Sequence, residues 1–328
     1  MLFSNRVGIV LATYNGQKYL YEQLVSIATQ SVKPDIVVIS DGGSSDDTVC
    51  ICKKVLFEYN IQCKILTSDR RLSVRENFEK CLENCDAKYI FFSDQDDVWL
   101  KTKIEEYLCL FEKYKPAMIF SNASLVDEKL KPLNRTLWET INYDNVSEIT
   151  VYKPNDKKYY EKMVNHNIVT GMCMAIDRSF VDEILPFSQH SIHDIWIANV
   201  VGFHAPIVAY NRCLVKYRQH PGNVVGTSTS ILKAYSHKNR YITRLDEDIL
   251  FWKDVIAKCT DKDIMHSCCD LKKFLEFRKN YIANKENIIS IVNRICDYKR
   301  FSNNWKRTIV KDIYARYFII GIGNDTKK

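Results

Sequence analysis

The sequence is marked first by features that it lacks. No apolar run among its 328 residues approaches the roughly 18–20 residues that a helix needs to cross a bilayer. The N-terminal apolar segment stops at Asn15 and Gly16 and has no small-residue cleavage site, so we expect no secretory signal. Internal repeats and low-complexity tracts are also absent. These absences argue against a membrane-spanning, secreted or repeat protein, and we expect a cytoplasmic location.

Cysteine is plentiful, at twelve residues, but its spacing carries no metal or disulfide signature. No C-x-x-C pair occurs. The closest neighbours are Cys50 and Cys52, Cys81 and Cys85, and Cys268 and Cys269. In a chain of this size without a secretion signal, this pattern indicates reduced thiols rather than a disulfide framework or a zinc site.

Two nucleotide-binding motifs are missing as well. No G-x-G-x-x-G follows the first apolar segment, which weakens the case for a dinucleotide-binding dehydrogenase. No G-x-x-x-x-G-K-[ST] occurs either, so nothing supports a P-loop enzyme.

What the sequence does contain is an alternation of apolar runs and amphipathic stretches. With 46% hydrophobic and 27% charged residues the composition is that of a globular protein. We expect strands at residues 7–12, 36–40, 63–66 and 89–93. Helices are expected at residues 19–30, from the polar run "DGGSSDDT" toward Tyr59, at residues 74–82 and at about 99–114. This order predicts an α/β fold with a doubly wound, mainly parallel central sheet flanked by helices.

Polar residues follow three of the expected strands, and ligands of such sheets sit outside the carboxyl ends of the strands. The most acidic of these ends is "SDQDD", with Asp94, Asp96 and Asp97. Closely spaced carboxylates repel each other unless a cation or a proton intervenes, and Mg2+ or Mn2+ prefers oxygen ligands shared with substrate phosphates. The alternative is that one of these acids caps the helix near Trp99 while the others are solvated.

The other two strand ends allow two interpretations. Asp41 precedes two glycines, so it forms either a turn or an acceptor for a nucleotide base N–H. Thr13, Tyr14 and Asn15 are either turn residues or a shelf for the base. All three polar ends are expected to converge on one crevice.

Charge divides the chain into two regions. Residues 231–328 hold 21 Lys and Arg against 12 Asp and Glu, whereas the preceding 230 residues are nearly balanced. We expect one domain over residues 1–226 and a basic, mainly helical region over 227–328. The segment "YKRFSNNWKRTIVKDIYARYFIIG" reads as a basic amphipathic helix with Phe301, Trp305, Ile309, Ile313, Tyr317 and Phe318. It either contacts an anionic membrane surface at its periphery or packs on the first domain, and no motif for nucleic acid accompanies it.

The motifs "VLATYNG", "VISDGGSSDDT", "FFSDQDDVW", "HDIW" and "YRQHPGNVVG", in this order, carry a resemblance to a known family. Over about residues 5–226 the chain resembles bacterial glycosyltransferase family 2 enzymes of the GT-A fold, and most of all the rhamnosyltransferase-like members that build surface polysaccharide. The resemblance implies an inverting, metal-dependent transfer from a UDP- or dTDP-sugar, such as dTDP-rhamnose, to a hydroxyl of a glycan or lipid-linked acceptor.

The resemblance also assigns roles to matching positions. It implies that Asp194 is the general base and that Mn2+ or Mg2+ is held by Asp94, Asp96 and His220. The implied nucleotide-sugar contacts are Thr13, Tyr14, Asn15, Asp41, Arg75, Asn77, Asp94 and Gln95. Asp97 is expected to be a cap or a supporting residue. Asp194 has the alternative of capping a helix that runs to about Gly202, and His193 either orients it or only begins that helix.

One position departs from the family pattern. Ser73 in "LSVRENF" stands where these enzymes usually carry glycine, which puts close backbone approach to the ligand in doubt. Pro221 and Gly222 after His220 are a milder change. Two other functions stay open on the sequence alone. One is another nucleotide enzyme, such as a nucleotidyltransferase; the other is a catalytically silent scaffold of the same fold.

Overall fold

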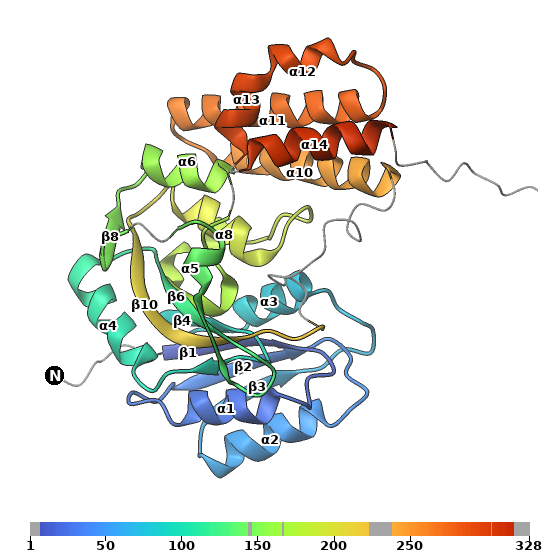
Figure 1. Ribbon diagram of the computed structural model, residues 1–328. Coiled ribbons are helices and arrows are strands. Elements are labelled where there is room, and N and C mark those ends of the chain that lie inside the picture. The colour runs from blue at the N-terminus through green and yellow to red at the C-terminus, as the bar shows by residue number, and fades with distance from the viewer. Residues whose placement is uncertain (1–6, 144–145, 166, 223–237, 303, 318–328) are drawn as a thin grey trace, which may run out of the picture. The chain divides into compact units, whose positions relative to one another are not determined.

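A computed structural model describes residues 7–143, 146–165, 167–222, 238–302 and 304–317 of the protein (Figure 1). The chain forms two compact units. The first unit comprises residues 1–156, 168–187 and 192–226, and the second comprises 157–167, 188–191 and 227–328. Our division of the chain at residue 226 assigned catalysis to the first part, and that assignment stays a prediction.

Four parallel strands form one half of the sheet in the first unit, in the order β3-β2-β1-β4. They are β1 (Val7–Thr13), β2 (Ile36–Asp41), β3 (Gln62–Leu66) and β4 (Tyr89–Ser93). Every residue of β2 and β4 is buried, which explains the continuous apolar runs, because strands covered on both faces have no polar side. Helices α1 (Leu20–Ala28) and α2 (Thr48–Glu58) lie on one face and α3 (Val74–Glu83) on the other (Figure 1).

The remainder of the sheet is mixed. The strand order continues from β4 through β9, β6 and β10 to β5, with β9 antiparallel to both of its neighbours and β10 parallel to β6. These strands are β5 (Val98–Trp99), β6 (Met118–Val126), β7 (Pro132–Thr136), β8 (Ile149–Tyr152), β9 (Met174–Asp177) and β10 (Ile207–Arg218). The helical segments are α4 (Lys103–Tyr114), α5 (Leu137–Thr140), η1 (Gly171–Cys173), η2 (Arg178–Phe180), α7 (Val181–Ile184) and α8 (His193–Val201). The predicted fold class is confirmed, with the doubly wound parallel part at residues 7–93.

One helix boundary was predicted wrongly. The helix expected from about Trp99 begins at Lys103, because Val98 and Trp99 instead form β5 and pair with Lys216 and Val215 of β10. This pairing spans more than 100 residues of sequence, so no local pattern reports it.

The second unit is helical. It contains α6 (Lys157–Asn165), α10 (Lys238–Lys258), α11 (Lys262–Ile282), α12 (Ile289–Asn293), α13 (Ile295–Phe301) and α14 (Trp305–Tyr317). The single amphipathic helix expected near the C-terminus is therefore two helices, and Phe301 is buried between them and α11 rather than displayed. Phe318 lies outside the described residues.

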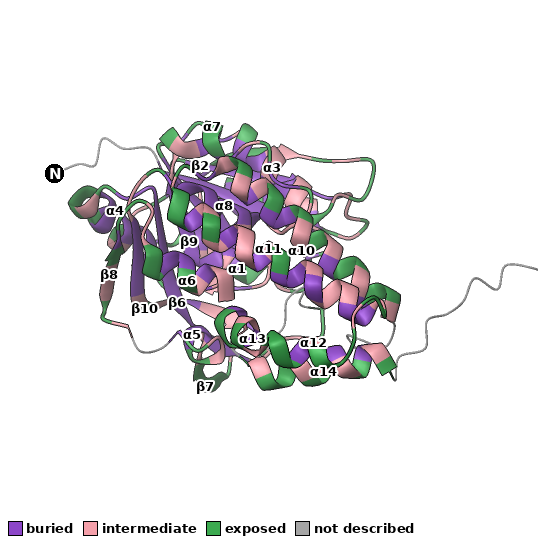
Figure 2. Ribbon diagram, turned by 90° about the horizontal axis from the view of Figure 1, so that it is seen from above, coloured by how far each residue is buried: buried purple, intermediate pink, exposed green. Residues whose placement is uncertain are grey.

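All twelve cysteines are free. Within the described ranges, none of the helices combines the length and the apolar character that a membrane crossing requires. Figure 2 shows that the buried residues of the first unit follow the central strands, whereas exposed residues are frequent on α12 and α14.

Candidate active site

The carboxyl ends of β1 and β2 are joined directly by two of the predicted residues. The Thr13 hydroxyl donates to Asp41 Oδ2 over 2.8 Å, at the register position where these residues face each other. Asp41 also accepts from the Ser44 hydroxyl (2.6 Å) and from the backbone N–H groups of Gly43 and Ser44. Asp41 is 2% exposed. The turn role that we considered for Asp41 is therefore present in this structure, and its nucleotide role stays a prediction.

Asn15 connects the loop after β1 to the loop after β2 by hydrogen bonds. Its φ of 45° is in the left-handed region, which asparagine tolerates better than most residues. Its backbone N–H donates to Ser44 Oγ over 2.8 Å, and its side-chain oxygen accepts from the Ser45 N–H over 2.9 Å. The loops that follow β1 and β2 thus form one connected surface.

Gln95 connects this surface to the acidic loop. Its side-chain amide accepts from the Tyr14 N–H (2.9 Å) and donates to the Tyr14 carbonyl (3.2 Å), as a neighbouring backbone strand would. A Cβ at residue 16 would lie 2.3 Å from Gln95 Oε1, so a larger residue there would displace the Gln95 amide from Tyr14. The Tyr14 ring is covered by the Arg71 guanidinium, 4.6 Å from the ring centre.

The α3 residues have structural partners. Asn77 accepts from the Ser40 hydroxyl over 2.8 Å and is 3% exposed, so it braces the end of β2. Arg75 pairs with Glu79 over 2.8 Å rather than standing free for a diphosphate. Ser73 is the N-cap of α3 and forms a capping box with Glu76. Since Ser73 has φ −70°, the backbone there does not require glycine, and the departure from the family pattern introduces no strain.

The acidic loop after β4 brings like charges together. Burial, followed by repulsion from Asp96 and Asp194, raises the pKa of Asp94 to about 7. The wholly buried Asp97 has its pKa raised well above the usual range by burial and by both neighbouring aspartates. The expectation that Asp97 caps the following helix is wrong, because the N-cap of α4 is Thr102 and Asp97 accepts the Arg218 N–H over 3.0 Å. The alternative, that Asp97 is a supporting residue, stays a prediction, and its Oδ2 has no hydrogen-bond partner within the described residues.

His220 contacts Asp96, with 2.8 Å between Nε2 and Oδ2. The contact joins two predicted metal-site residues that are 124 positions apart in the sequence. The His220 ring also lies 4.8 Å from the Tyr19 ring, and the Arg218 guanidinium lies over the Tyr19 ring at 4.5 Å from its centre.

Arg218 was not among the predicted site residues, although it lies in the motif "YRQH". Its side chain is almost completely buried and donates to the carbonyls of Asp96 (2.7 Å) and Glu128 (2.6 Å) and to the Glu22 carboxylate (2.5 Å). A buried arginine needs such partners, and here they fix the acidic loop against α1 and β10. The sequence did contain a signal for Arg218, because it is a charged residue at the end of a buried strand, two positions before His220.

Lys103 was also missed. It is fully buried, donates to the Met172 carbonyl over 2.6 Å and lies 3.7 Å from the centre of the Trp99 ring. Burial lowers the pKa of Lys103 to about 7, against the opposing effect of Asp97 and Asp94. The signal was its place on the apolar stripe of α4 with Tyr107, Leu110 and Phe111.

Asp194 lies in the first turn of α8 and is 5% exposed. Its carboxylate accepts from the Gly171 N–H over 3.1 Å and from the Ile195 N–H over 2.6 Å. Burial raises the pKa of Asp194 to about 7 despite these hydrogen bonds. The N-cap of α8 is Ile192, so the alternative that Asp194 caps this helix is wrong.

His193 is held by packing alone. Its ring stacks on Phe78 at 3.9 Å, and neither ring nitrogen has a hydrogen-bond partner within the described residues. Burial lowers the pKa of His193 to about 3, so the ring is neutral. A Cβ on Gly171 would meet His193 Nε2 at 2.5 Å, so the glycine allows the backbone to reach both His193 and Asp194.

The acidic loop fits a divalent cation by its donor set. Mutual repulsion of Asp94 and Asp96 is the condition that a bound cation relieves, and the imidazole of His220 is at the same place. In the described part of the chain, no group of three or more His, Cys, Asp or Glu side chains suffices to hold a metal ion. A cation here would therefore share its ligands with a phosphate group, as Mg2+ usually does.

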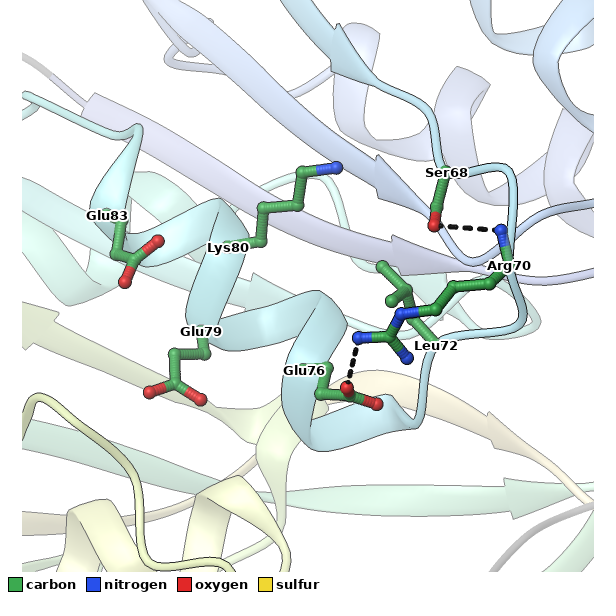
Figure 3. A pocket seen from close by; sticks show the side chains of 7 residues that line it. All are labelled: Ser68, Arg70, Leu72, Glu76, Glu79, Lys80 and Glu83. Carbon is green, nitrogen blue, oxygen red and sulfur yellow. Dashed lines mark hydrogen bonds and ion pairs between the residues drawn. The ribbon is translucent and has the colours of Figure 1, made fainter.

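Two surface hollows of the first unit are lined by other residues. One, of about 360 Å3, is lined by Ser68, Arg70, Leu72, Glu76, Glu79, Lys80 and Glu83 (Figure 3). Arg70 crosses it to pair with Glu76 over 2.7 Å, so these two charges are matched within the hollow. A second, of about 450 Å3, lies by Tyr21, Val25 and Trp99. Neither hollow includes Asp94, Asp96 or Asp194.

Comparison with protein families gives one match that covers more than half of the chain. The sequence model of Glycosyl transferase family 2 matches residues 8–185. This range contains the three polar strand ends and stops before Asp194 and His220.

Individual relatives are more distant. The dTDP-rhamnosyl transferase RfbG of Shigella flexneri is 35% identical over 35% of this chain and 38% of that protein. The WfaP glucosyltransferase of Escherichia coli, named for UDP-Glc and α-D-GlcNAc-diphosphoundecaprenol, is 25% identical over 66% of this chain and 79% of that protein. The matches to RfbG and to the Bacillus subtilis EpsE protein span less than half of those relatives.

Solved structures share the fold. Staphylococcus aureus TarS 1–349 in complex with UDP-GlcNAc has a TM-score of 0.60 at 14% identity, over 95% of this chain and 87% of that chain. The mannosyltransferase PcManGT of Pyrobaculum calidifontis, in complex with GDP-Man and Mn2+, has a TM-score of 0.57 at 12% identity, over 96% and 86%. At these identities the likeness concerns the fold alone.

Proposed function

Because the chain belongs to glycosyl transferase family 2 and has the GT-A fold of that family, we propose that it is an inverting, metal-dependent sugar transferase. The proposed donor is a dTDP- or UDP-sugar, such as dTDP-rhamnose. The proposed acceptor is a hydroxyl of a glycan or lipid-linked precursor in bacterial surface-polysaccharide synthesis. The names of two relatives support this donor and this acceptor. RfbG is named a dTDP-rhamnosyl transferase, and WfaP is named for the donor UDP-Glc and the acceptor α-D-GlcNAc-diphosphoundecaprenol.

The observation that carries the proposal is the contact between Asp96 and His220, with Asp94 and a separate buried carboxylate, Asp194, close enough to interact electrostatically. Asp96 contacts His220, and the charge of Asp194 contributes to the raised pKa of Asp94. Glycosyl transfer with inversion needs two such functions. One stabilises the charge on the departing diphosphate, and the other accepts the proton of the attacking hydroxyl.

Asp194 is the proposed general base. The hydroxyl proton passes to a carboxylate oxygen of Asp194 while the oxygen attacks the anomeric carbon and the nucleoside diphosphate leaves from the opposite face. The Gly171 and Ile195 N–H groups hold the carboxylate in place. A pKa near 7 suits this role, because a base is most effective when its pKa lies near the working pH.

Asp94, Asp96 and His220 would hold Mn2+ or Mg2+. The bound cation supplies Lewis-acid stabilisation of the negative charge on the diphosphate. Two carboxylates with an imidazole suit Mn2+ somewhat better than Mg2+, which strongly prefers oxygen ligands. Arg218 contributes by holding the backbone of this loop in position.

The donor nucleotide is proposed to lie on the loops after β1 and β2. Thr13, Tyr14, Asn15 and Asp41 form this surface, and Gln95 links it to the cation site. Asp41 would accept the N3–H of uracil or thymine after the Ser44 hydroxyl gives way. Asn77 braces the end of β2 beneath the base, and Arg75 would reach a diphosphate only by leaving Glu79.

A thermal-shift screen of UDP- and dTDP-sugars with and without Mn2+ tests the proposal. A donor present at 100 times its dissociation constant should stabilise the protein by about 2.7 kcal/mol, and only when the cation is present. Asp96→Asn should abolish the cation dependence, whereas Asp46→Asn on the neighbouring loop should keep it. If no nucleotide sugar gives a cation-dependent shift, the proposal is wrong.

A further inference from the structure

Helices α12 and α14 of the second unit display apolar side chains to solvent. Six such residues are between 44% and 65% exposed. They are Ile288, Ile289 and Val292 at α12, and Val310, Tyr314 and Tyr317 on α14. On α14 the spacing of 310, 314 and 317 places all three on one side of the helix. We refer to these six residues as the apolar face.

The segment before α12 is tied to α14. Arg316 of α14 donates to the carbonyls of Tyr281 (3.0 Å) and Glu286 (2.5 Å). The turn that leads into α12 is therefore held at the C-terminal end of α14, beside Tyr317. Figure 2 shows both helices with exposed residues along them.

The segment that carries this face is mainly basic. Residues 283–317 contain eight Lys and Arg against three Asp and Glu. Of the bases, Lys285, Arg294, Lys299, Arg300, Lys306 and Arg307 are exposed. Two of these bases are offset, because Asp297 pairs with Arg294 over 2.9 Å and Asp270 of α11 pairs with Arg300 over 3.0 Å. Lys285, Lys299, Lys306 and Arg307 make up the exposed basic excess, since Asp312 is fully buried and Glu286 is only partly exposed.

We propose that the apolar face, with Lys306 and Arg307 beside it, docks on the surface of an anionic phospholipid bilayer. Exposed aliphatic residues enter the boundary between headgroups and acyl chains, tyrosine is favoured at that depth, and basic residues are attracted to anionic lipid. A second copy of this chain fits less well, because pairing two such faces would bring like charges together. The inference does not depend on the proposed sugar transfer.

Flotation of the purified full chain with vesicles tests this proposal. The protein should float with vesicles of equal parts phosphatidylglycerol and phosphatidylcholine and should stay behind with phosphatidylcholine alone. Each Lys or Arg near an anionic surface strengthens binding about fivefold, so Lys306→Gln with Arg307→Gln should weaken it roughly 25-fold. Ile289→Ser with Val292→Ser should weaken binding about tenfold or more.

Helix α2 of the first unit offers matched controls. Phe57 is 88% exposed, and Lys53 and Lys54 are exposed beside it. The control for the apolar changes is Phe57→Ser, and the control for the charge changes is Lys53→Gln with Lys54→Gln. Both controls should leave flotation unchanged. Circular dichroism and thermal unfolding of each variant show whether it is folded.

Three outcomes would overturn the proposal. The first is no flotation of the folded wild-type chain with anionic vesicles. The second is an equal effect of the α2 variants and the α12 or α14 variants. The third is a dimer in solution that the Ile289 and Val292 changes dissociate, without vesicle binding, which would make the face an interface between copies. Donor binding is measured separately, so failure here leaves the sugar-transfer proposal unaffected.

Discussion

At the scale of single residues, the protonation of Asp194 controls the proposed reaction. Burial raises its pKa to about 7, so below that pH the carboxyl is protonated and cannot accept a proton. Turnover should therefore rise as pH increases through about 7 and then level off. Asp194→Asn should reduce kcat by about 10²–10⁴-fold and leave the donor-induced thermal shift intact. Full turnover in this variant would remove Asp194 from the role of base.

Gly171 is the residue on which the position of Asp194 depends. Alanine at 171 would place its Cβ 2.5 Å from His193 Nε2, and the stacked Phe78 ring restricts movement of the imidazole. We expect Gly171→Ala to cost about 1–3 kcal/mol of stability through overpacking and to displace the N–H that Asp194 accepts.

The double variant Gly171→Ala with His193→Ala separates a steric effect from a chemical one. Removing the imidazole makes room for the new methyl group, so kcat and its pH profile should recover relative to Gly171→Ala alone. His193→Ala alone should mainly lower stability, since the neutral ring has no hydrogen bond to lose. If the double variant is no better than the single one, the steric account is wrong.

At the scale of elements, Ser73 shows how a departure from a family pattern is accommodated. Its side chain accepts the Glu76 N–H and its own N–H donates to Glu76, at the start of α3. Ser73→Ala should cost about 1 kcal/mol in the unfolding free energy, and Ser73→Gly only a few tenths, because glycine is a tolerated N-cap. Urea unfolding of both variants measures this order, and the reverse order would contradict the capping role.

The same capping box gives α3 a pH dependence. Hydrogen bonds from Ser73 and Arg70 lower the pKa of Glu76 to about 2. For a lowered carboxyl pKa, the stabilisation is complete above the unfolded value near 4.5 and is lost as pH falls toward 2. The difference in stability between wild type and Ser73→Ala should therefore shrink between about pH 4.5 and pH 2. A difference that is constant over this range would argue against the contact.

Arg218 links three elements that are distant in sequence. It contacts the β4–β5 loop through Asp96, α1 through Glu22, and the loop after β6 through Glu128. Arg218→Lys keeps the charge but cannot reach all three acceptors, and losing the part-buried hydrogen bonds to the Asp96 and Glu128 carbonyls should cost about 1–3 kcal/mol each. Glu22→Gln, which alters only a half-exposed partner, should cost less than about 1 kcal/mol. Unfolding in guanidinium measures the loss of stability in both variants. Equal losses would show that the hydrogen bonds of the buried Arg218 guanidinium are unimportant.

At the scale of the whole molecule, local patterns predicted some parts of the structure well. Strands β1, β2 and β4 follow from short apolar runs bounded by polar turns, and α1 follows from the spacing of Leu20, Leu24 and Ile27, all of which are fully buried. The convergence of the strand ends follows from parallel pairing, since the register sets Thr13 against Asp41. Each of these features depends on residues that are near in sequence or on a general rule of sheet topology.

Several features that depend on distant residues were not predicted. β5 exists because Trp99 meets Val215, and Asp97 is buried because Arg218 donates to it. Lys103 and Arg218 have charged side chains whose burial is possible only because of partners supplied by remote segments. A local pattern assigns such residues to the surface, so the sequence indicated the acids of the site and missed the two buried cations near them.

The second unit has its own polar centre, which should govern its stability. Asp312 of α14 is fully buried and accepts from Arg278 of α11 (2.8 Å), Tyr241 of α10 (2.7 Å) and Tyr298 of α13 (2.6 Å). Asp312→Ala leaves the largely buried Arg278 guanidinium without its counter-charge, which costs about 3–5 kcal/mol. Asp297→Ala, which breaks an exposed pair with Arg294 in the same unit, should cost less than about 1 kcal/mol.

Limited proteolysis and donor binding together show which part of the protein is destabilised by Asp312→Ala. Cleavage should increase within residues 238–317, because four helices meet at this carboxylate. The cation-dependent shift given by the nucleotide sugar should persist, since every residue proposed to bind the donor belongs to the first unit. If the variant loses donor binding while residues 238–317 stay resistant to protease, Asp312 acts on the site itself and not through the fold of the helical unit.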